Sequence, residues 1–297
     1  MKNMMNNCLI ATALNKHARI YILNSKQMVE EARKLHNLYP TSCAALGRTM
    51  SVTALMGLMQ KDENEVVTTT INGGGPIGTV MCVALNTGEV KGFVSNPEFY
   101  ETYPNSHKLA VGVGVGTNGS LKVTKNLKLK QAYTSEVPLR TGEIGDDFAY
   151  YFSVSEQVPT IVSVGVLVDT DYSVKSAGAM IIELLPNHTE EDIVYLENLN
   201  LKPISSVLDA NPDIHEYLSV LFKDAEILEE KHVYYHCDCS KERFLRNLLT
   251  LPKKDLEEIA LDEKIEIKCE FCDKTYSFNK DDINLLLNYA NKKPEDK

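Results

Sequence analysis

The chain has 297 residues, of which 43% are hydrophobic, and this length and composition allow two domains with a sizeable core. No run approaches the roughly 18 consecutive apolar residues of a membrane span. Lys16 and Arg19 interrupt the first apolar stretch, which argues against a secretion signal. We therefore expect a cytoplasmic protein with no membrane partner, whose cysteines stay reduced.

The formal net charge of −10 is concentrated in one short segment. Residues 1–187 carry 16 basic and 16 acidic side chains, and residues 231–297 carry 13 and 14. Residues 188–230 carry only 2 basic side chains against 11 acidic ones, a net charge of −9. Negative charges held this close together repel one another, which lowers the stability of any compact state of the segment. A well-solvated acidic helix face would have the same composition, so both interpretations stay open.

Residues 1–187 are expected to form an α+β domain, a mixture of sheet and helix. A strand-like segment runs to Leu23, and Ser25 is positioned to cap the helix that follows. The next helix, Thr41–Gln60, is apolar on much of its circumference, which predicts burial against a sheet. An amphipathic helix is expected at Gly142–Gln157. Runs rich in Val, Thr and Ile predict strands at Val66–Ile71, Gly78–Leu85, Glu89–Ser95, Gln131–Val137, Ile161–Val168 and Ala177–Leu185.

Two glycine triplets have the spacing Gly-x-Gly-x-x-Gly, and neither predicts a phosphate-binding loop. A dinucleotide fingerprint must open a helix, whereas strand-like residues follow both triplets. We expect Asn118-Gly119 to form a hairpin turn. No Gly-Lys-Ser/Thr motif occurs, so a nucleotide partner is not expected. The triplets are Gly73, Gly75 and Gly78, and Gly114, Gly116 and Gly119.

Catalysis is not expected either. Glu143, Asp146 and Asp147 lie at the start of the Gly142–Gln157 helix, where acidic side chains stabilise the helix dipole. Paired carboxylates can also perform acid–base chemistry, but no histidine or nucleophile motif accompanies them. The sequence therefore favours a protein that is not an enzyme.

Residues 188–231 are expected to be an acidic helical linker of marginal stability. A helix begins at Thr189, and a second ends near Phe222. The apolar side chains of these helices need a surface to lie on. If that surface or the module that follows is lost, they become exposed.

Four of the seven cysteines occur as two close pairs in residues 232–297, which predicts a small zinc-binding domain. Cys237 and Cys239 form the first pair, and Cys269 and Cys272 form the second. Zn²⁺ favours four thiolates in a tetrahedron, so we expect one ion per chain. A Cys-x-Cys pair could instead close a strained, labile disulfide, so the same sulfurs could hold zinc when reduced and form two local disulfides when oxidised. A permanent structural zinc ribbon is the alternative.

A module of about 60 residues has a poor core, so metal is expected to hold it together. Ser240 is expected to cap a helix, Ile265–Lys268 and Thr275–Phe278 to form strands, and Asp281–Asn291 to form the last helix. We expect His236 not to be a ligand. The remaining cysteines, which we expect to be small buried hydrophobic residues, are Cys8, Cys43 and Cys82.

Motifs along the whole chain resemble the redox-regulated 33 kDa heat-shock chaperonin family. The similarity rests on Cys237-Asp-Cys-Ser-Lys-Glu-Arg243, Cys269-Glu-Phe-Cys-Asp-Lys-Thr-Tyr276, Gly142–Gln157, the Gly73–Gly78 turn, and Ser176-Ala-Gly-Ala179 through Leu184-Leu-Pro186. Ala179 departs from the family pattern, which often has a second glycine there. This departure affects packing or turn geometry and not the cysteine centre.

The resemblance implies an ATP-independent holdase that is inactive while reduced and zinc-bound. All four cysteines would be zinc ligands, and oxidation would pair Cys237 with Cys239 and Cys269 with Cys272. Oxidants under mild unfolding stress would release zinc, unfold the linker and let the protein bind unfolding client proteins. Dimerisation on activation is implied as well.

Two other functions compete with this one. A zinc-ribbon nucleic-acid-binding module should be basic, whereas residues 231–297 have a net charge of −1. A thiol–disulfide oxidoreductase needs one accessible, low-pKa pair that turns over with substrate thiols, which four zinc-bound cysteines do not offer.

Overall fold

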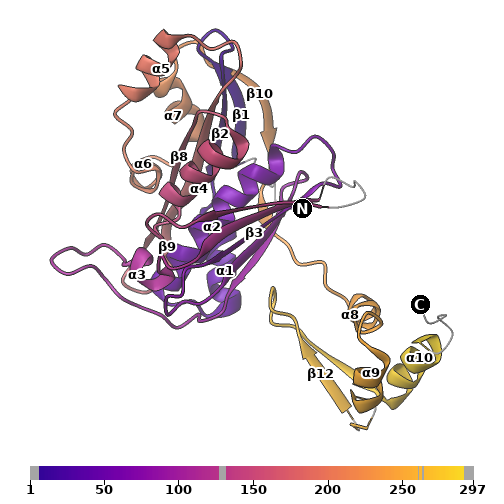
Figure 1. Ribbon diagram of the computed structural model, residues 1–297. Helices are drawn as coiled ribbons and strands as arrows, with labels where there is room; N and C mark the ends of the chain where they lie inside the picture. Colours follow the sequence, from indigo (N-terminus) through magenta and orange to yellow (C-terminus); the bar gives the residue numbers. More distant parts are fainter. Residues whose placement is uncertain (1–6, 127–131, 260, 263, 291–297) are drawn as a thin grey trace. The chain divides into compact units, whose positions relative to one another are not determined.

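The computed structural model describes residues 7–126, 132–259, 261–262 and 264–290. The chain divides into two compact units with the boundary between His236 and Cys237 (Figure 1). Both units contain helices and strands, which confirms the predicted α+β class.

One sheet of the first unit has five strands in the order β10-β1-β2-β9-β8, and each neighbouring pair is antiparallel. The strand expected up to Leu23 is in fact two strands, β1 and β2. Leu14, Asn15 and Lys16 take positive φ values and reverse the chain between them. The strands are β1 (Cys8–Ala13), β2 (Ala18–Asn24), β8 (Thr160–Val168), β9 (Val174–Leu184) and β10 (Glu226–Lys231).

The other sheet has six strands in the order β11-β5-β4-β3-β6-β7. Its pairs are antiparallel except β11 with β5, which is parallel. The strands expected at Val66–Ile71, Gly78–Leu85 and Glu89–Ser95 are confirmed. Gln131, where the fourth strand was expected to begin, lies outside the described residues. The strands are β3 (Val66–Asn72), β4 (Val80–Leu85), β5 (Glu89–Val94), β6 (Ser120–Asn126), β7 (Tyr133–Pro138) and β11 (Tyr234–Tyr235).

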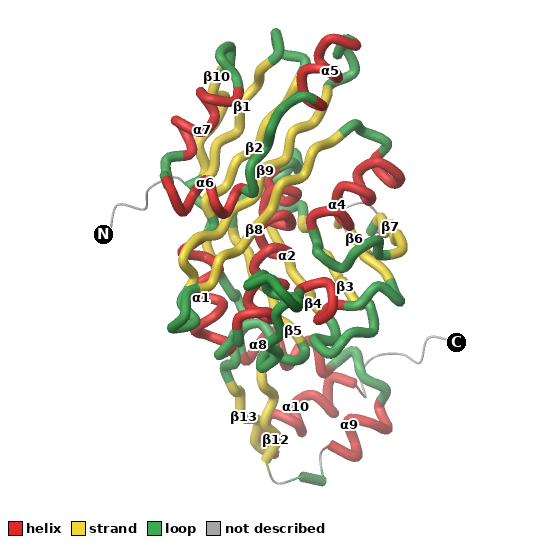
Figure 2. Tube along the Cα trace, turned by 90° about the vertical axis from the view of Figure 1, so that its left-hand side faces the viewer, coloured by secondary structure: helices red, strands yellow, loops and turns green. Residues whose placement is uncertain are grey.

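Helix α2 (Pro40–Leu58) packs against strands of both sheets and is the core of the first unit (Figure 2). Every residue of α2 except Arg48 is buried, as its all-round apolar sequence predicts. Helix α1 (Lys26–His36) precedes it. Ser25 occupies the N-cap position of α1, but its hydroxyl lies 2.7 Å from Ser51 Oγ and makes no cap hydrogen bond. The predicted side-chain cap is therefore wrong, because the Ser25 hydroxyl hydrogen-bonds to Ser51 of α2 and not to the backbone of α1.

The two glycine triplets lie against each other. Gly75 N donates to Val115 O at 2.9 Å, and a Cβ on Gly75 would lie 2.4 Å from Gly114 O. Glycine is therefore required here by close backbone approach. The hairpin expected at Asn118-Gly119 is wrong, because helix α3 (Val111–Val115) rather than a strand precedes it.

The predicted Gly142–Gln157 helix is shorter, comprising α4 (Gly145–Tyr151) and the π-helix η1 (Phe152–Glu156). Asp147 is fully buried at its start. Its carboxylate accepts backbone hydrogen bonds from Arg140 at 2.7 Å, Thr141 at 3.1 Å and Ile144 at 3.0 Å. This carboxylate is committed to holding the turn before α4.

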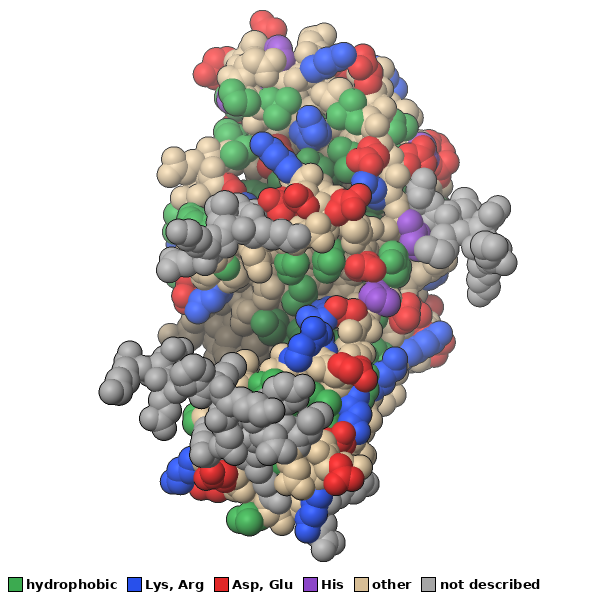
Figure 3. Space-filling model, turned by 90° about the vertical axis from the view of Figure 1, so that its right-hand side faces the viewer, with side chains coloured by type: hydrophobic (Ala, Val, Ile, Leu, Met, Phe, Trp, Pro, Cys, Tyr) green, Lys and Arg blue, Asp and Glu red, His purple; other side chains and the backbone are tan. Residues whose placement is uncertain are grey.

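Within the described ranges, no helix combines the length and apolar character needed to cross a membrane. On the face drawn in Figure 3, Lys and Arg are interspersed among Asp and Glu and do not gather into a continuous basic area. A nucleic-acid-binding surface requires such an area, so this face does not provide one.

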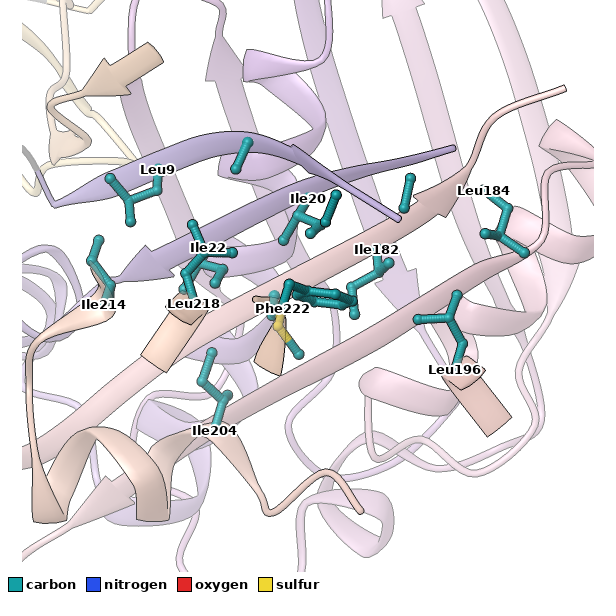
Figure 4. Close-up of a cluster of buried hydrophobic side chains, with 14 of the residues drawn as sticks. Leu9, Ile20, Ile22, Ile182, Leu184, Leu196, Ile204, Ile214, Leu218 and Phe222 are labelled. Carbon is teal, nitrogen blue, oxygen red and sulfur yellow. The ribbon is translucent and has the colours of Figure 1, made fainter. Parts of the chain in front are cut away.

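The linker helices lie on one face of the five-stranded sheet, the surface that the sequence analysis required for them (Figure 4). They are α5 (Glu190–Glu197), α6 (Ile204–Ala210) and α7 (Ile214–Leu221), followed by β10 at the sheet edge. Helix α5 begins where predicted, with Thr189 as its N-cap residue. The buried side chains that the linker contributes are Leu196, Ile204, Leu208, Ile214, Leu218 and Phe222. They contact Leu9, Ala11, Ala13, Ala18, Ile20, Ile22, Met180, Ile182 and Leu184 of the sheet.

Of the eleven acidic side chains in residues 188–230, only Asp192 is buried. Its Oδ2 lies 2.8 Å from His17 Nδ1 in the β1–β2 turn and accepts from Thr189 N at 2.7 Å. The other ten acidic residues are all exposed, and some bind basic side chains, as Asp209 does with Lys175 at 2.9 Å and Glu226 with Lys16 at 3.1 Å. The linker is thus an apolar layer with a solvated acidic outer surface.

The second unit is small. Its helices are α8 (Lys241–Leu248), α9 (Lys253–Ile259) and α10 (Lys280–Ala290), and its hairpin consists of β12 (Lys264–Lys268) and β13 (Thr275–Asn279). Ser240 Oγ accepts from Arg243 N at 3.2 Å, which confirms the predicted cap of α8. Asn291, the expected end of the last helix, lies outside the described residues. Among the described residues, Phe278, Ile283 and Leu286 form its buried cluster, partly buried hydrophobic side chains pack against them, and Leu256 is also buried.

Candidate metal centre

The four predicted cysteines meet at one place in the second unit. Their Sγ atoms all lie within 4.8 Å of one another, and none is in a disulfide. The shortest separations run across the two pairs: 3.8 Å between Cys237 and Cys269, and 3.2 Å between Cys239 and Cys272. Residues more than thirty positions apart in sequence are thus brought into contact by the fold.

The hairpin turn between β12 and β13 presents the second pair. Cys269 N donates to Lys274 O at 2.9 Å, and Cys269 O accepts from Cys272 N at 3.3 Å and Asp273 N at 2.8 Å. Asp273 takes a φ of 58°, a left-handed value that Asp tolerates better than most residues. These bonds bend the backbone so that both thiols, which are buried, point to one side.

The first pair lies immediately before α8. Cys239 precedes the cap residue Ser240, so the start of the helix fixes the backbone at this cysteine. Cys237 and Cys239 are partly exposed, whereas Cys269 and Cys272 are buried. Solvent therefore reaches the site from the Cys-Asp-Cys side.

Tyr276 of β13 is the polar neighbour that the sequence analysis missed. Its hydroxyl lies 3.2 Å from Cys239 Sγ and donates to Cys239 O at 2.9 Å. Its ring packs against Phe244 of α8, with centroids 5.2 Å apart. The only sequence signal was its place four residues after Cys272, within the quoted motif, and that position alone does not reveal a contact with Cys239.

The thiols differ in their tendency to ionise. Burial raises the pKa of Cys237 to about 11 and also raises that of Cys272, because a thiolate is poorly solvated there. Burial opposes ionisation of Cys239 too, but hydrogen bonds with Tyr276 and the other three cysteines outweigh it and lower its pKa to about 7. Cys239 thus forms a thiolate near neutral pH, and thiolates are the form that oxidants attack.

The geometry fits a tetrahedral metal site. With metal–sulfur distances of about 2.3 Å, a zinc tetrahedron places its sulfurs about 3.8 Å apart. The observed separations of 3.2 and 3.8 Å, and the 4.8 Å limit for the whole set, lie close to that value. These four cysteines could hold one metal ion, and soft thiolates select zinc over the hard cations magnesium and calcium.

The other cysteines and His236 are not members of this group. Cys8, Cys43 and Cys82 are fully buried in the first unit, as predicted. Burial raises the pKa of Cys43 to about 12 and also raises those of Cys8 and Cys82, so these thiols stay neutral. His236 donates from its backbone N to Val90 O at 2.8 Å and is not in the metal-binding group.

Replacing Tyr276 with phenylalanine is expected to weaken zinc binding by roughly tenfold, because outer-shell hydrogen bonds orient and stabilise metal ligands. Competition against a chromophoric chelator measures the change. Ser277→Ala removes a hydroxyl from the next residue of the same strand, whose Oγ lies 3.4 Å from Glu266 Oε1, and should leave affinity unaltered. Equal affinities for the two variants would show that the Tyr276–Cys239 contact contributes nothing to metal binding.

Comparison with known proteins adds an independent line of argument. A family model described as Hsp33 protein matches residues 6–279. The "33 kDa chaperonin" of Alkaliphilus oremlandii is 43% identical over 290 residues, covering 95% of this chain and 96% of that protein. The "33 kDa chaperonin" of Clostridium novyi is 41% identical over 287 residues, covering 95% and 98%. The crystal structure of the Thermotoga maritima 33 kDa chaperonin superposes with a TM-score of 0.84 at 33% identity, covering 97% of this chain and 100% of that one.

Proposed function

The chain belongs to the Hsp33 family of 33 kDa chaperonins, and from this premise we propose that it is a redox-regulated, ATP-independent holdase. Reduced protein holds one Zn²⁺ through Cys237, Cys239, Cys269 and Cys272 and is inactive. Oxidation of these thiols releases the zinc, loosens the linker and lets the protein bind unfolding clients. The observation that carries the proposal is the convergence of four thiols in a unit whose own core is very small.

Metal loss has a large energetic consequence for the second unit. Bound zinc would supply four metal–thiolate bonds, worth about 10–16 kcal/mol in small zinc domains. A whole protein is stable by only about 5–15 kcal/mol, and the buried cluster found among the described residues of this unit, Phe278, Ile283 and Leu286, is small. Without the metal, residues 237–290 therefore have too little buried apolar surface to stay folded.

The proposed disulfides join Cys237 with Cys239 and Cys269 with Cys272. Each bond forms when two thiolates and two protons react with one hydrogen peroxide to give a disulfide and two waters. Local pairing leaves the two halves of the site unconnected, so the module can open. Crosswise pairing of the closest sulfurs, Cys239 and Cys272, would close a loop of more than thirty residues and stabilise the module instead.

The linker is the element through which opening would reach the first unit. Tyr234 and Tyr235 pair with β5 just before Cys237, and Asn7 Nδ2 donates to Val233 O at 3.0 Å. β10 precedes them and pairs with β1 at the sheet edge. If unfolding begins at Cys237, the next element toward the N-terminus is the two-residue strand β11. The element before that is β10, an edge strand rich in acidic residues. We propose that residues 188–231 detach and expose the apolar face beneath them, with residues 1–187 as the chaperone domain and residues 232–297 as the redox switch.

The experiment that tests this function treats reduced, zinc-loaded protein with hydrogen peroxide at mildly raised temperature. Zinc release is followed with a chromophoric chelator while light scattering follows the aggregation of a thermally unfolding client. We expect zinc release and suppression of aggregation to rise together and to reverse with reductant and zinc. Zinc retention, or release without suppression, would contradict the proposal.

Peptide mapping of the oxidised protein tests the pairing. Trypsin cleaves after Lys231, Lys241, Lys268 and Lys274, which places Cys237 with Cys239 in one peptide and Cys269 with Cys272 in another. Local disulfides leave the two peptides separate, each two mass units lighter than its reduced form. A covalently joined pair of peptides would show crosswise bonds and contradict local pairing.

The remaining parts of the proposal concern partners and location. Unfolding proteins are the partners, with a homodimer forming on activation and no nucleic acid, nucleotide or membrane involved; the protein acts in the cytoplasm and is not an enzyme. A thiol–disulfide oxidoreductase is the rival function, since Cys239 has a lowered pKa. Repeated turnover of a dithiol substrate by the reduced protein would favour that rival.

A further inference from the structure

Three exposed tyrosines form a cluster on the first unit that the proposed switch does not use. Tyr39, Tyr100 and Tyr172 are 40%, 53% and 37% exposed. The ring of Tyr172 lies 5.7 Å from that of Tyr39 and 6.2 Å from that of Tyr100, centroid to centroid. The rings come from three separate connections: the one between α1 and α2, the loop after β5, and the β8–β9 turn. We call these residues the tyrosine cluster.

Tyr172 takes a strained backbone conformation in the β8–β9 turn. Tyr172 has a φ of 69° in the β8–β9 turn, a left-handed value that glycine adopts freely and a bulky residue does not. Its N donates to Asp169 O at 2.9 Å, and Asp169 N donates to Ser173 O at 2.8 Å, so the turn geometry is fixed. Residues held in such conformations concentrate at binding sites. The strained conformation of Tyr172 is therefore consistent with a binding role for its ring.

Acidic groups outnumber basic ones in the segments around the rings. Residues 37–41, 96–102 and 169–173, which flank the rings, contain no Lys, Arg or His, and the loop that carries Tyr100 continues to His107 and Lys108. Their acidic side chains are all exposed, namely Glu98, Glu101, Asp169 and Asp171. Arg33, which interacts electrostatically with Asp171, makes two 2.8 Å hydrogen bonds to Glu30. The surface around the tyrosine cluster is thus aromatic and negatively charged.

We propose that the tyrosine cluster is a docking site for arginine- and lysine-rich stretches of unfolded client polypeptides. Guanidinium and ammonium groups stack on tyrosine faces and pair with carboxylates, so the two features of this surface select the same partner. The inference rests on the proposed chaperone function and names a chemical class of client. Because the cluster is exposed while the linker is folded, it binds such segments in reduced protein as well, as a weak first contact.

The test uses reduced, zinc-loaded protein and a twelve-residue probe peptide of alternating Arg and Ser with one Trp. The chain has no Trp, so Trp fluorescence reports only on the peptide. We expect salt-sensitive binding that Tyr172→Gly weakens about two- to fivefold, the size expected for loss of one cation–π contact. Tyr100→Ala should weaken binding similarly. Tyr133→Ala removes a 56% exposed tyrosine outside the cluster and should change nothing.

Thermal unfolding of the same variants separates binding from structure. Glycine relieves the backbone strain at position 172, so Tyr172→Gly should keep the melting temperature or raise it by up to about 3 °C. The same variant should bind the probe peptide more weakly. A lowered melting temperature with unchanged binding would assign the ring a packing role and overturn the proposal. Equal binding of a probe with Glu in place of Arg would overturn it too.

The result is independent of the redox switch. Peptide binding is measured without oxidant, whereas zinc release and aggregation suppression require it. Failure of the peptide to bind would remove the docking site and leave the switch standing. Failure of the switch with intact peptide binding would do the reverse.

Discussion

Cys269→Ser is expected to abolish stoichiometric zinc binding and unfold the second unit. A serine hydroxyl does not ionise near neutral pH and is a poor zinc ligand, so the site loses one of four thiolates. The loss should cost a large part of the roughly 10–16 kcal/mol that structural zinc supplies. Hydrogen exchange should then show no protection in residues 237–290. If the proposed switch is correct, this variant suppresses client aggregation without oxidant.

Cys43→Ala is the matched control for this variant. Cys43 is a fully buried cysteine of α2, in the first unit, so its removal tests for effects of losing any thiol. We expect one zinc per chain and no activity before oxidation. One tightly bound zinc per chain in Cys269→Ser as well would refute the four-cysteine site. Zinc loss without aggregation suppression would separate the site from the chaperone switch.

Phe222→Ala is expected to activate the chaperone while zinc stays bound. Phe222 is 1% exposed and lies at the end of α7 among the side chains that join the linker to the sheet. Truncating a buried Phe costs about 3–5 kcal/mol. This loss should release the linker, because buried apolar contacts of this kind are what hold it on the five-stranded sheet. Hydrogen exchange in residues 190–231 should rise, and reduced protein should suppress client aggregation.

Val220→Ala is the control on the same helix, since Val220 is 64% exposed and outside the buried cluster. It should remain inactive until oxidised. Zinc content must be measured on both variants, because the prediction concerns linker release at full zinc occupancy. Rapid exchange in the linker of Phe222→Ala with no gain of activity would show that uncovering the sheet is insufficient for client binding.

Local features were predictable where a few neighbouring residues decide them. The helix start at Thr189, the cap at Ser240 and the buried helix α2 each follow from a short stretch of sequence, and the structure confirms them. The spacing of the cysteine pairs likewise predicted the four sulfurs that the fold brings within 4.8 Å. The binding of zinc and the disulfide pairing of the cysteines on oxidation stay predictions.

Local patterns failed where a distant segment supplied the partner. Ser25 looks like a helix cap, but Ser51 takes its hydroxyl. Asn118-Gly119 looks like a hairpin turn, yet glycine is needed at 119 because a Cβ would lie 1.9 Å from Asn72 O. In both cases the competing contact is a tertiary one that no local propensity contains.

The sequence by itself determined the cysteine pairs, the charge of the linker and the need of its apolar side chains for a surface. Only the tertiary structure decided which surface that is, which tyrosine contacts Cys239, and that three tyrosines from separate connections meet. The physical reason is that spacing and periodicity act over a few residues along the chain. Contacts between distant segments depend on how strands pair and helices pack, and these are fixed only when the whole core assembles.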